Sequence, residues 1–247
     1  MRGNESTRLN ENGALFVDFD GTLVEIAPRP DAVVLPAGMV QLLATLHTRL
    51  GGALAVVSGR PIAQLDAFLA PLSLPAAGLH GAERRSASGV VTRLTPADLT
   101  QVVADLQALA AVHAGLLVEP KPGAVALHYR LAPDCELLAQ QVMQAALQRS
   151  PGMVLMHGKM VIEMKPAAAS KGRAIEAFMA EPPFAGRRPL FAGDDTTDES
   201  GFAVVQAAGG IGIKVGPGPT QARHRLDTPT RLHAWLQACA DQTLEPS

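Results

Sequence analysis

Short apolar segments alternate with helical segments at the beginning of the chain. Residues 14–17 and 53–57 are apolar and strand-length, and residues 38–50 between them place leucines at helical spacing. Residues 62–70 again look helical, and a short strand with a glycine turn is expected over 76–83. This order predicts a parallel sheet covered by helices, with right-handed crossovers. In such sheets ligands bind beyond the carboxyl ends of the strands.

The alternation of strands and helices is interrupted between residues 84 and 165 and resumes afterwards. The middle segment is typical of helix, hairpin, helix, hairpin, which indicates a compact α+β unit with antiparallel strands. Parallel α/β signals resume with a helix after Ser170, a plausible N-cap, and a strand over 188–192. We therefore predict a flexible N-terminal lead and an α/β core that is interrupted by an inserted cap domain. The expected bounds are 1–12 for the lead, 13–83 and 166–247 for the core, and 84–165 for the cap.

Composition excludes several classes of partner. The 247 residues are 47% hydrophobic, and 21 basic against 23 acidic residues give a formal net charge of −2. No long basic run favours nucleic acid or an anionic membrane. No apolar stretch approaches the roughly 18 residues of a membrane span, and the polar start lacks the apolar region of a secretory signal. We expect a cytoplasmic protein in which Cys135 and Cys239 are separate thiols.

The first strand ends in two carboxylates. In ALFVDFDGTL (14–23), Asp18 and Asp20 follow the apolar run one residue apart and precede Gly21 and Thr22. Alternate strand residues share a face, and two carboxylates beside a buried strand are costly unless a positive charge lies between them. Oxygen ligands of this kind suit Mg²⁺. The alternative is a solvated turn, because Asp and Gly are ordinary turn residues.

Three further clusters follow strands or open a helix. Ser58 follows the second strand, Lys171 begins the helix after Ser170, and GDDTTDE (193–199) follows the strand over 188–192. Helix N-termini present free N–H groups to anions, and carboxylates with a metal complete a site for a phosphoryl group. Each cluster alone also fits a turn, a solvated lysine, a capped helix start or a calcium-like acidic loop. Their joint occurrence, in this order, favours the site.

The chemistry of phosphoryl transfer suggests a role for each residue of these clusters. Asp18, held most rigidly, would attack phosphorus and form an aspartyl-phosphate, and Asp20 would protonate the leaving oxygen and then activate water. Ser58 and Lys171 would hold the phosphoryl oxygens. Asp194 would complete the Mg²⁺ shell, and Asp195 or Asp198 would orient water or Lys171.

In DFDGT, VVSGR, SKG and GDDTTDE, in that order, the sequence resembles the haloacid dehalogenase (HAD) superfamily of phosphotransferases. Within it, the chain is similar to the trehalose-6-phosphate phosphatase family through GLHGAE (78–83), EPKPGAVALHYR (119–130), HGKMVIEMKP (157–166) and GDDTTDES (193–200). The resemblance implies a Rossmann-like parallel-sheet core with helices on both faces and a C2-type cap of αββαββ order. It also implies Mg²⁺-dependent hydrolysis of trehalose 6-phosphate, a step of trehalose biosynthesis.

The resemblance carries residue roles as well. Asp18 is implied as nucleophile and Asp20 as acid/base. The implied metal ligands are Asp18, Asp20, Asp194 and Asp195, with Asp198 in support. The implied substrate-binding residues are Glu119, Lys121, Glu163, Arg60, His128 and Arg130.

The cap residues have a physical argument and an alternative of their own. Glu119 and Lys121 share a strand face, and charged side chains can satisfy several hydroxyls of a disaccharide. On spacing alone, a solvated hairpin with incidental charges is the favoured interpretation, and the family resemblance reverses that preference. Three alternatives stay open for function: a phosphatase for sucrose 6-phosphate or mannosyl-3-phosphoglycerate, a phosphotransferase or mutase, and a non-catalytic sugar-phosphate sensor. The expected partner is a small-molecule substrate, a disaccharide phosphate, and the sequence does not identify a protein partner.

Overall fold

The computed structural model describes residue 9 and residues 12–26, 32–95, 98–121, 123–158 and 160–241. Apart from residues 9 and 12, the lead predicted over 1–12 lies outside the described residues, as do Pro122 and Lys159 of the two predicted hairpin turns. The chain divides into two compact units. Unit 1 contains residues 1–93 and 170–247, and unit 2 contains residues 94–169.

Unit 1 is built on an eight-stranded sheet in the order β12-β11-β10-β1-β2-β3-β4-β5. The strands from β12 to β3 are parallel, and β4 and β5 continue the sheet antiparallel. The bounds are β1 Gly13–Val17, β2 Leu54–Val57, β3 Ala76–Gly78, β4 Glu83–Arg85, β5 Val91–Arg93, β10 Arg188–Gly193, β11 Ile211–Val215 and β12 His224–Leu226. Because β1 lies between β10 and β2, the carboxyl ends of these three strands are adjacent.

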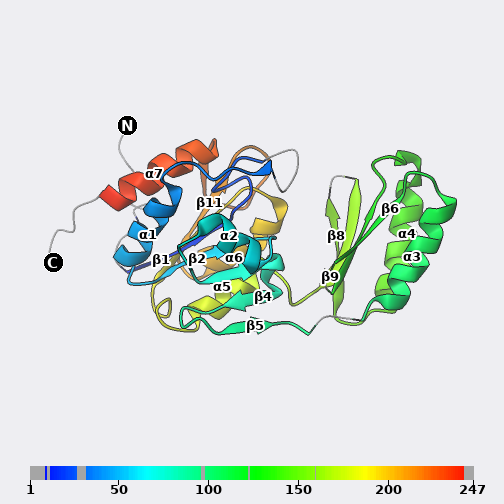
Figure 1. Ribbon diagram of the computed structural model, residues 1–247, viewed down its shortest axis with the longest axis horizontal. Coiled ribbons are helices and arrows are strands. Elements are labelled where there is room, and N and C mark those ends of the chain that lie inside the picture. Colours follow the sequence, from blue (N-terminus) through cyan, green and yellow to red (C-terminus); the bar gives the residue numbers. More distant parts are fainter. Residues whose placement is uncertain are drawn as a thin grey trace. The chain divides into compact units, whose positions relative to one another are not determined.

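Five α-helices accompany the sheet among the described residues of unit 1. They are α1 Met39–Arg49, α2 Ile62–Leu69, α5 Lys171–Met179, α6 Glu199–Ala207 and α7 Pro229–Asp241. Figure 1 shows α1 and α7 together on one side of the strands and α5 on the other. All five residues of β1 are buried, and the ring of Phe16 lies 5.3 Å from that of Phe184 and 5.9 Å from that of Phe178 in α5. An all-apolar strand of this kind is expected where helices cover both faces of a sheet.

The segment over 84–93 differs from the expectation. We predicted it within the cap, but Glu83–Arg85 pairs with β3, and Val91–Arg93 pairs in turn with β4. Arg85 is held by two hydrogen bonds to Asp66 at 2.6 and 2.7 Å and by the Leu74 carbonyl. The sequence did not indicate these two strands because the segment is polar. Strands at the edge of a sheet can carry charged side chains and so lack the apolar pattern of central strands.

Unit 2 has the predicted order of helix, hairpin, helix, hairpin. Its helices are α3 Thr100–Val112 and α4 Glu136–Gln148, and its strands are β6 Leu117–Lys121, β7 Ala124–His128, β8 Met153–Gly158 and β9 Val161–Pro166. The sheet order is β6-β7-β9-β8, and every pairing is antiparallel. Both helices lie on one face of this sheet (Figure 1). Leu106 and Met143 from the helices and Leu127 and Ile162 from the strands form the core of unit 2.

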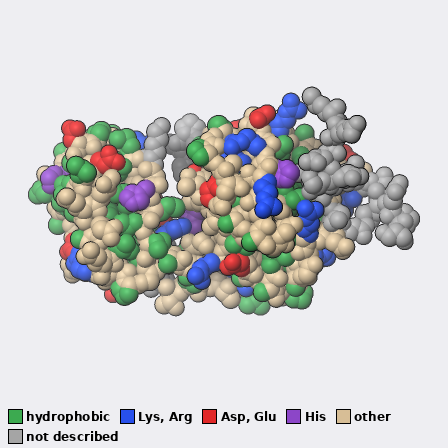
Figure 2. Space-filling view, turned by 180° about the vertical axis from the view of Figure 1, so that it is seen from behind, with side chains coloured by type: hydrophobic (Ala, Val, Ile, Leu, Met, Phe, Trp, Pro, Cys, Tyr) green, Lys and Arg blue, Asp and Glu red, His purple; other side chains and the backbone are tan. Residues whose placement is uncertain are grey.

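The predicted fold class, a parallel-sheet α/β core with an α+β cap, is confirmed. In the described part of the chain no helix has the length and apolarity needed to cross a bilayer. Cys135 and Cys239 are both free thiols. On the face drawn in Figure 2, single Lys and Arg side chains are scattered among neutral ones, so the described residues form no extended basic surface there.

Candidate active site

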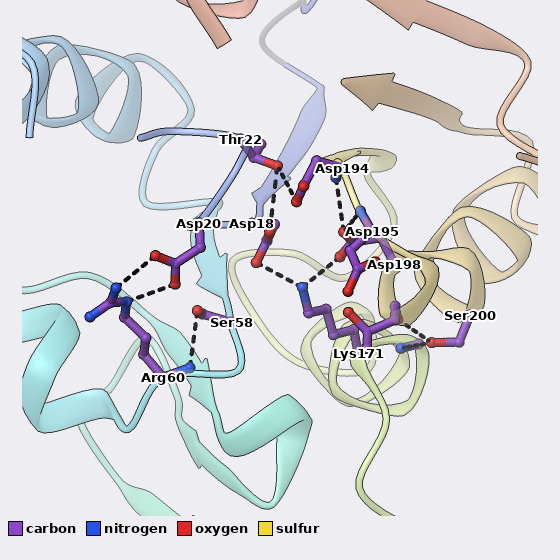
Figure 3. A network of polar contacts seen from close by, with 12 residues as sticks. Asp18, Asp20, Thr22, Ser58, Arg60, Lys171, Asp194, Asp195, Asp198 and Ser200 are labelled. Carbon is purple, nitrogen blue, oxygen red and sulfur yellow. Dashed lines mark hydrogen bonds and ion pairs between the residues drawn. The ribbon is translucent and has the colours of Figure 1, made fainter. Parts of the chain in front are cut away.

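The predicted core residues meet at the carboxyl edge of the parallel strands in unit 1. Asp18 follows β1, Ser58 follows β2, and Asp194 follows β10, while Lys171 is the first residue of α5. Figure 3 shows Asp18, Lys171, Asp194 and Asp198 pointing toward one another. Parallel strands in adjacent positions place their carboxyl ends side by side, which is why motifs far apart in the chain converge.

Lys171 lies between two carboxylates. Its Nζ donates to Asp18 Oδ1 at 2.7 Å and to Asp198 Oδ1 at 2.6 Å. Burial alone would lower the pKa of Lys171, but the charges of Asp18 and Asp198 outweigh it and raise that pKa above its usual value. The ammonium therefore stays charged and orients Asp18.

Asp198 organises the loop that follows β10. Its Oδ2 accepts from the backbone N–H groups of Asp194 and Asp195, both at 2.9 Å, while Oδ1 accepts from Lys171. The side chain is fully buried. A Cβ at Gly193 would overlap this carboxylate, so the last residue of β10 leaves the space that Asp198 fills. With both oxygens accepting from N–H donors, Asp198 positions Lys171 and Asp194.

Three carboxylates offer a place for a cation. One oxygen each from Asp18, Asp194 and Asp198 lies within 4.8 Å of the others. Burial raises the pKa of Asp18 well above its usual range, with Asp198 and Asp194 adding to the effect and Lys171 opposing it. Burial, reinforced by the Asp198 charge, also raises the pKa of Asp194 to about 6. Crowded carboxylates of this kind fit a hard divalent cation, which would neutralise their charge.

Two oxygens of this group, one from Asp18 and one from Asp194, face the hydroxyl of Thr22. Thr22 Oγ1 lies 3.4 Å from Asp18 Oδ2 and 3.4 Å from Asp194 Oδ1, so the two carboxylates face each other across the hydroxyl. Gly21 has a φ of +75°, and a Cβ there would overlap the Asp194 carboxylate. A glycine at this position therefore lets the Asp194 side chain approach the β1 loop.

Asp20 and Asp195 lie outside the group of three, although we predicted both as metal ligands. Both Asp20 oxygens accept from the Arg60 guanidinium, each at 2.7 Å. The Asp195 side chain is exposed at the start of the short helical turn Thr196–Asp198. The DxD spacing suggested that Asp20 joins Asp18, but a bidentate arginine partner holds the second carboxylate to one side, as Figure 3 shows.

Arg60, predicted to bind substrate, binds Asp20 in the structure. Its guanidinium lies 5.5 Å from the centre of the Phe19 ring and 5.0 Å from that of Phe68, and the side chain is 9% exposed. Ser58 Oγ accepts from the Arg60 backbone N–H at 3.2 Å. The SGR turn thus connects the predicted phosphate-binding hydroxyl to the carboxylate that we predicted as acid/base.

The GLHGAE segment adjoins this turn. Leu79 and His80 have φ values of +51° and +56°, a left-handed conformation that costs free energy in residues other than glycine. The His80 N–H donates to the Ser58 carbonyl at 2.9 Å, and Glu83 Oε1 accepts from the Ile62 N–H at 2.5 Å. These bonds fix the loop after β2.

The predicted sugar-binding residues gather on the sheet of unit 2. Glu119, Ala126 and Glu163 are register partners across β6, β7 and β9. Lys121 Nζ donates to Glu163 Oε2 at 2.8 Å, and His128 Nε2 lies 2.9 Å from Glu119 Oε2. This polar cluster alternates along β7 and β9 with Leu127 and Ile162 of the core, so it lies on the sheet face opposite the helices. Arg130 is exposed in the turn after β7.

Two contacts near the site escaped the sequence analysis. Thr22, treated only as a turn residue, is buried between Asp18 and Asp194. Lys214 is buried in β11, and its Nζ donates to the backbone carbonyl of Asp194. A signal was present in the second case, because Lys214 is a single charged residue within the apolar run GGIGIKV.

Comparisons with known proteins identify a family for this chain. The model of the trehalose-phosphatase family matches residues 16–230. A probable trehalose-phosphate phosphatase of Sinorhizobium fredii is 49% identical over 87% of this chain and 82% of its own. The trehalose-6-phosphate phosphatase of Escherichia coli is 46% identical over 94% of this chain and 88% of its own. The solved structure of a trehalose-6-phosphate phosphatase related protein superposes with a TM-score of 0.72 at 27% identity, covering 92% of this chain and 96% of that one. With a family match that runs through both units and takes in every strand-end motif of the site, the chain belongs to the trehalose-phosphatase family.

Proposed function

We propose that this protein hydrolyses trehalose 6-phosphate to trehalose and phosphate through an aspartyl-phosphate on Asp18. The observation that carries the chemistry is the buried Asp18–Lys171–Asp198 arrangement beside Asp194 at the strand ends. The substrate follows from relatives named trehalose-phosphate phosphatase at 46–49% identity.

In the first step an Asp18 oxygen attacks phosphorus, and the bond between phosphorus and the sugar 6-oxygen breaks. Lys171 holds Asp18 Oδ1, so the other oxygen of the carboxylate, Oδ2, is available for attack. Lys171 also supplies positive charge next to the phosphoryl oxygens, and the Ser58 hydroxyl donates a hydrogen bond to one of them. For this step Asp20 must be protonated on one oxygen and keep its contact with Arg60 through the other, and it then gives that proton to the departing sugar oxygen.

In the second step water attacks the phosphorus of the aspartyl-phosphate, and the bond to Asp18 breaks to release phosphate. Asp20, now ionised, takes the proton from that water. The Arg60 guanidinium holds both Asp20 oxygens, while 38% exposure leaves the side chain accessible to substrate. The role that we propose for Arg60 is therefore to orient the acid/base.

We propose Mg²⁺ as the cation, held by Asp194 and by the Asp18 oxygen that does not attack phosphorus. When bound, Mg²⁺ would neutralise the repulsion between these carboxylates and the phosphoryl group and would polarise that group. Asp198 and Lys171 fix the two ligands from behind, and Gly21 gives Asp194 its space.

For unit 2 we propose recognition of the disaccharide by Glu119, Lys121 and Glu163. Their paired charges leave further donor and acceptor positions for sugar hydroxyls. His128 and Arg130, next to them in the HYR segment, are proposed as additional contacts. Unit 2 is joined to unit 1 by two chain crossings, near residues 93 and 170.

Phosphate release from a panel of sugar phosphates tests the proposal. With Mg²⁺ present, we expect trehalose 6-phosphate to give the highest kcat/KM among trehalose 6-phosphate, glucose 6-phosphate, sucrose 6-phosphate and mannosyl-3-phosphoglycerate. Equal rates on glucose 6-phosphate would overturn the substrate and leave the phosphatase chemistry standing. No release from any member would overturn both, and would favour the sugar-phosphate sensor.

A further inference from the structure

Lys214 is a buried cation in unit 1 whose partners in the described part of the chain are backbone carbonyls. It lies in β11 beside Gly193 of β10 in the parallel register and is 4% exposed. Its Nζ donates to the carbonyl oxygens of Asp194 and Val215, the latter at 3.0 Å. Among the described residues, no carboxylate oxygen lies within ion-pair distance of Nζ.

Such a lysine is unfavourable for stability by itself. A buried ammonium loses its hydration, and neutral carbonyls compensate for that loss only in part. All residues of β11 are buried, so a methionine at this position would fill the space without the desolvation cost. One of the two carbonyls that Lys214 binds belongs to Asp194, a member of the group of three carboxylates that could hold a cation.

The Asp194 peptide groups are held from both ends. Its N–H donates to Asp198 Oδ2 at 2.9 Å, and its C=O accepts from Lys214. Asp198 is itself fixed by Lys171, which also holds Asp18. The Asp194 carboxylate lies against Gly21, where a Cβ would overlap it. A shift of the Asp194 backbone would therefore move the carboxylate out of this space. Of the groups that fix this backbone, Lys214 is the one that comes from outside the predicted motifs.

We propose that Lys214 is a positioning residue for the cation ligand Asp194. It anchors the Asp194 carbonyl and thereby fixes the direction of the Asp194 carboxylate toward Asp18. This rests on the proposed function only in that Asp18 and Asp194 hold Mg²⁺. Groups that orient a metal ligand from behind typically change metal affinity by about 10- to 100-fold when they are removed.

The test measures Mg²⁺ binding to the full chain by isothermal titration calorimetry, without substrate. For Lys214→Met we expect the Mg²⁺ dissociation constant to rise at least about 10-fold, and the rise in unfolding temperature that Mg²⁺ produces to shrink. Lys214→Gln, whose side-chain nitrogen is one bond closer to the backbone, should lose the same contact and behave alike. Lys214→Arg, which keeps the cation, should recover part of the affinity.

Arg225→Met is the matched control. Arg225 is the register partner of Lys214 on β12 and also donates to backbone carbonyls at this sheet edge, those of Gly216 and Gly218. Because it does not touch Asp194, its removal should leave the Mg²⁺ dissociation constant unchanged.

The outcomes separate the two proposals. A parental Mg²⁺ dissociation constant in Lys214→Met or Lys214→Gln overturns the positioning role, as does an unfolding temperature that falls equally with Mg²⁺ and with EDTA. Failure of all three Lys214 variants to fold would mark the residue as structural and overturn the proposal too. If the parent binds Mg²⁺ but does not hydrolyse trehalose 6-phosphate, the proposed function fails, while the Mg²⁺ titrations still decide the role of Lys214.

Discussion

The polar clusters of the two units are built in opposite ways. In unit 1, Asp18 and Lys171 have side chains 5% and 3% exposed, and each has a fixed partner. In unit 2, Glu119 and Lys121 are 49% and 35% exposed, and they pair 3.9 Å apart. Electrostatic interactions are strong and geometry is fixed in the buried cluster, whereas water competes for the contact between Glu119 and Lys121 in the more exposed one. We therefore expect the first cluster to carry the chemistry and the second to carry substrate choice.

The largest effect is expected for Asp18→Asn. The amide cannot attack phosphorus, so kcat for phosphate release should fall by at least about 10⁴-fold. A circular dichroism spectrum and an unfolding transition without Mg²⁺ that match those of the parent would show that the fold survives. A variant that hydrolyses as fast as the parent would mean that the buried cluster does not perform the chemistry, and would remove the contrast between the units.

Removal of the divalent cation is expected to act next most strongly. Chelation should lower kcat by at least about 10²-fold, because a bound cation contributes several kcal/mol of charge stabilisation. Addition of Mg²⁺ should restore activity and, at about 100 times its dissociation constant, add roughly 2.7 kcal/mol to the free energy of unfolding. Full activity in excess chelator would contradict the cation proposal. The cap variant Lys121→Ala should keep the same Mg²⁺ response, since its contacts lie in unit 2.

Lys121→Ala itself should change substrate choice. Loss of one charge-assisted hydrogen bond is worth about 1.5–3 kcal/mol, so kcat/KM for trehalose 6-phosphate should fall by roughly 10- to 100-fold. The rate with p-nitrophenyl phosphate, which lacks the sugar, should change little. Arg149→Ala is the control, because Arg149 pairs with Asp105 on exposed helix surfaces of the same unit. An equal loss on both substrates would assign Lys121 to the reaction rather than to the sugar.

The smallest effect compares two glycines with left-handed backbone. Gly21 has φ +75° and Asp194 against it, while Gly152 in unit 2 has φ +79° and no atom within 4 Å of the added Cβ. Gly152→Ala should cost about 1 kcal/mol of stability from backbone strain alone. Gly21→Ala should cost about 1–3 kcal/mol and also weaken Mg²⁺ binding, because Asp194 must move. Denaturant unfolding and calorimetry measure the two effects. Equal costs, with Mg²⁺ affinity unchanged, would show that Asp194 does not need this space.

Local sequence sufficed for the parts of this protein that depend on periodicity and strand ends. Apolar runs and leucine spacing predicted the parallel core, and the order of DFDGT, SGR, SKG and GDD predicted which side chains meet, because carboxyl ends of adjacent parallel strands share an edge. Only the tertiary structure decided which side chains bind one another and which segments join the core sheet. Asp20 binds Arg60, Asp198 rather than Asp195 joins the carboxylate group, residues 84–93 extend the core sheet, and Lys214 reaches the Asp194 carbonyl. The reason is physical: spacing fixes where a side chain begins, but its partner depends on register, burial and the charges that the rest of the fold brings within reach.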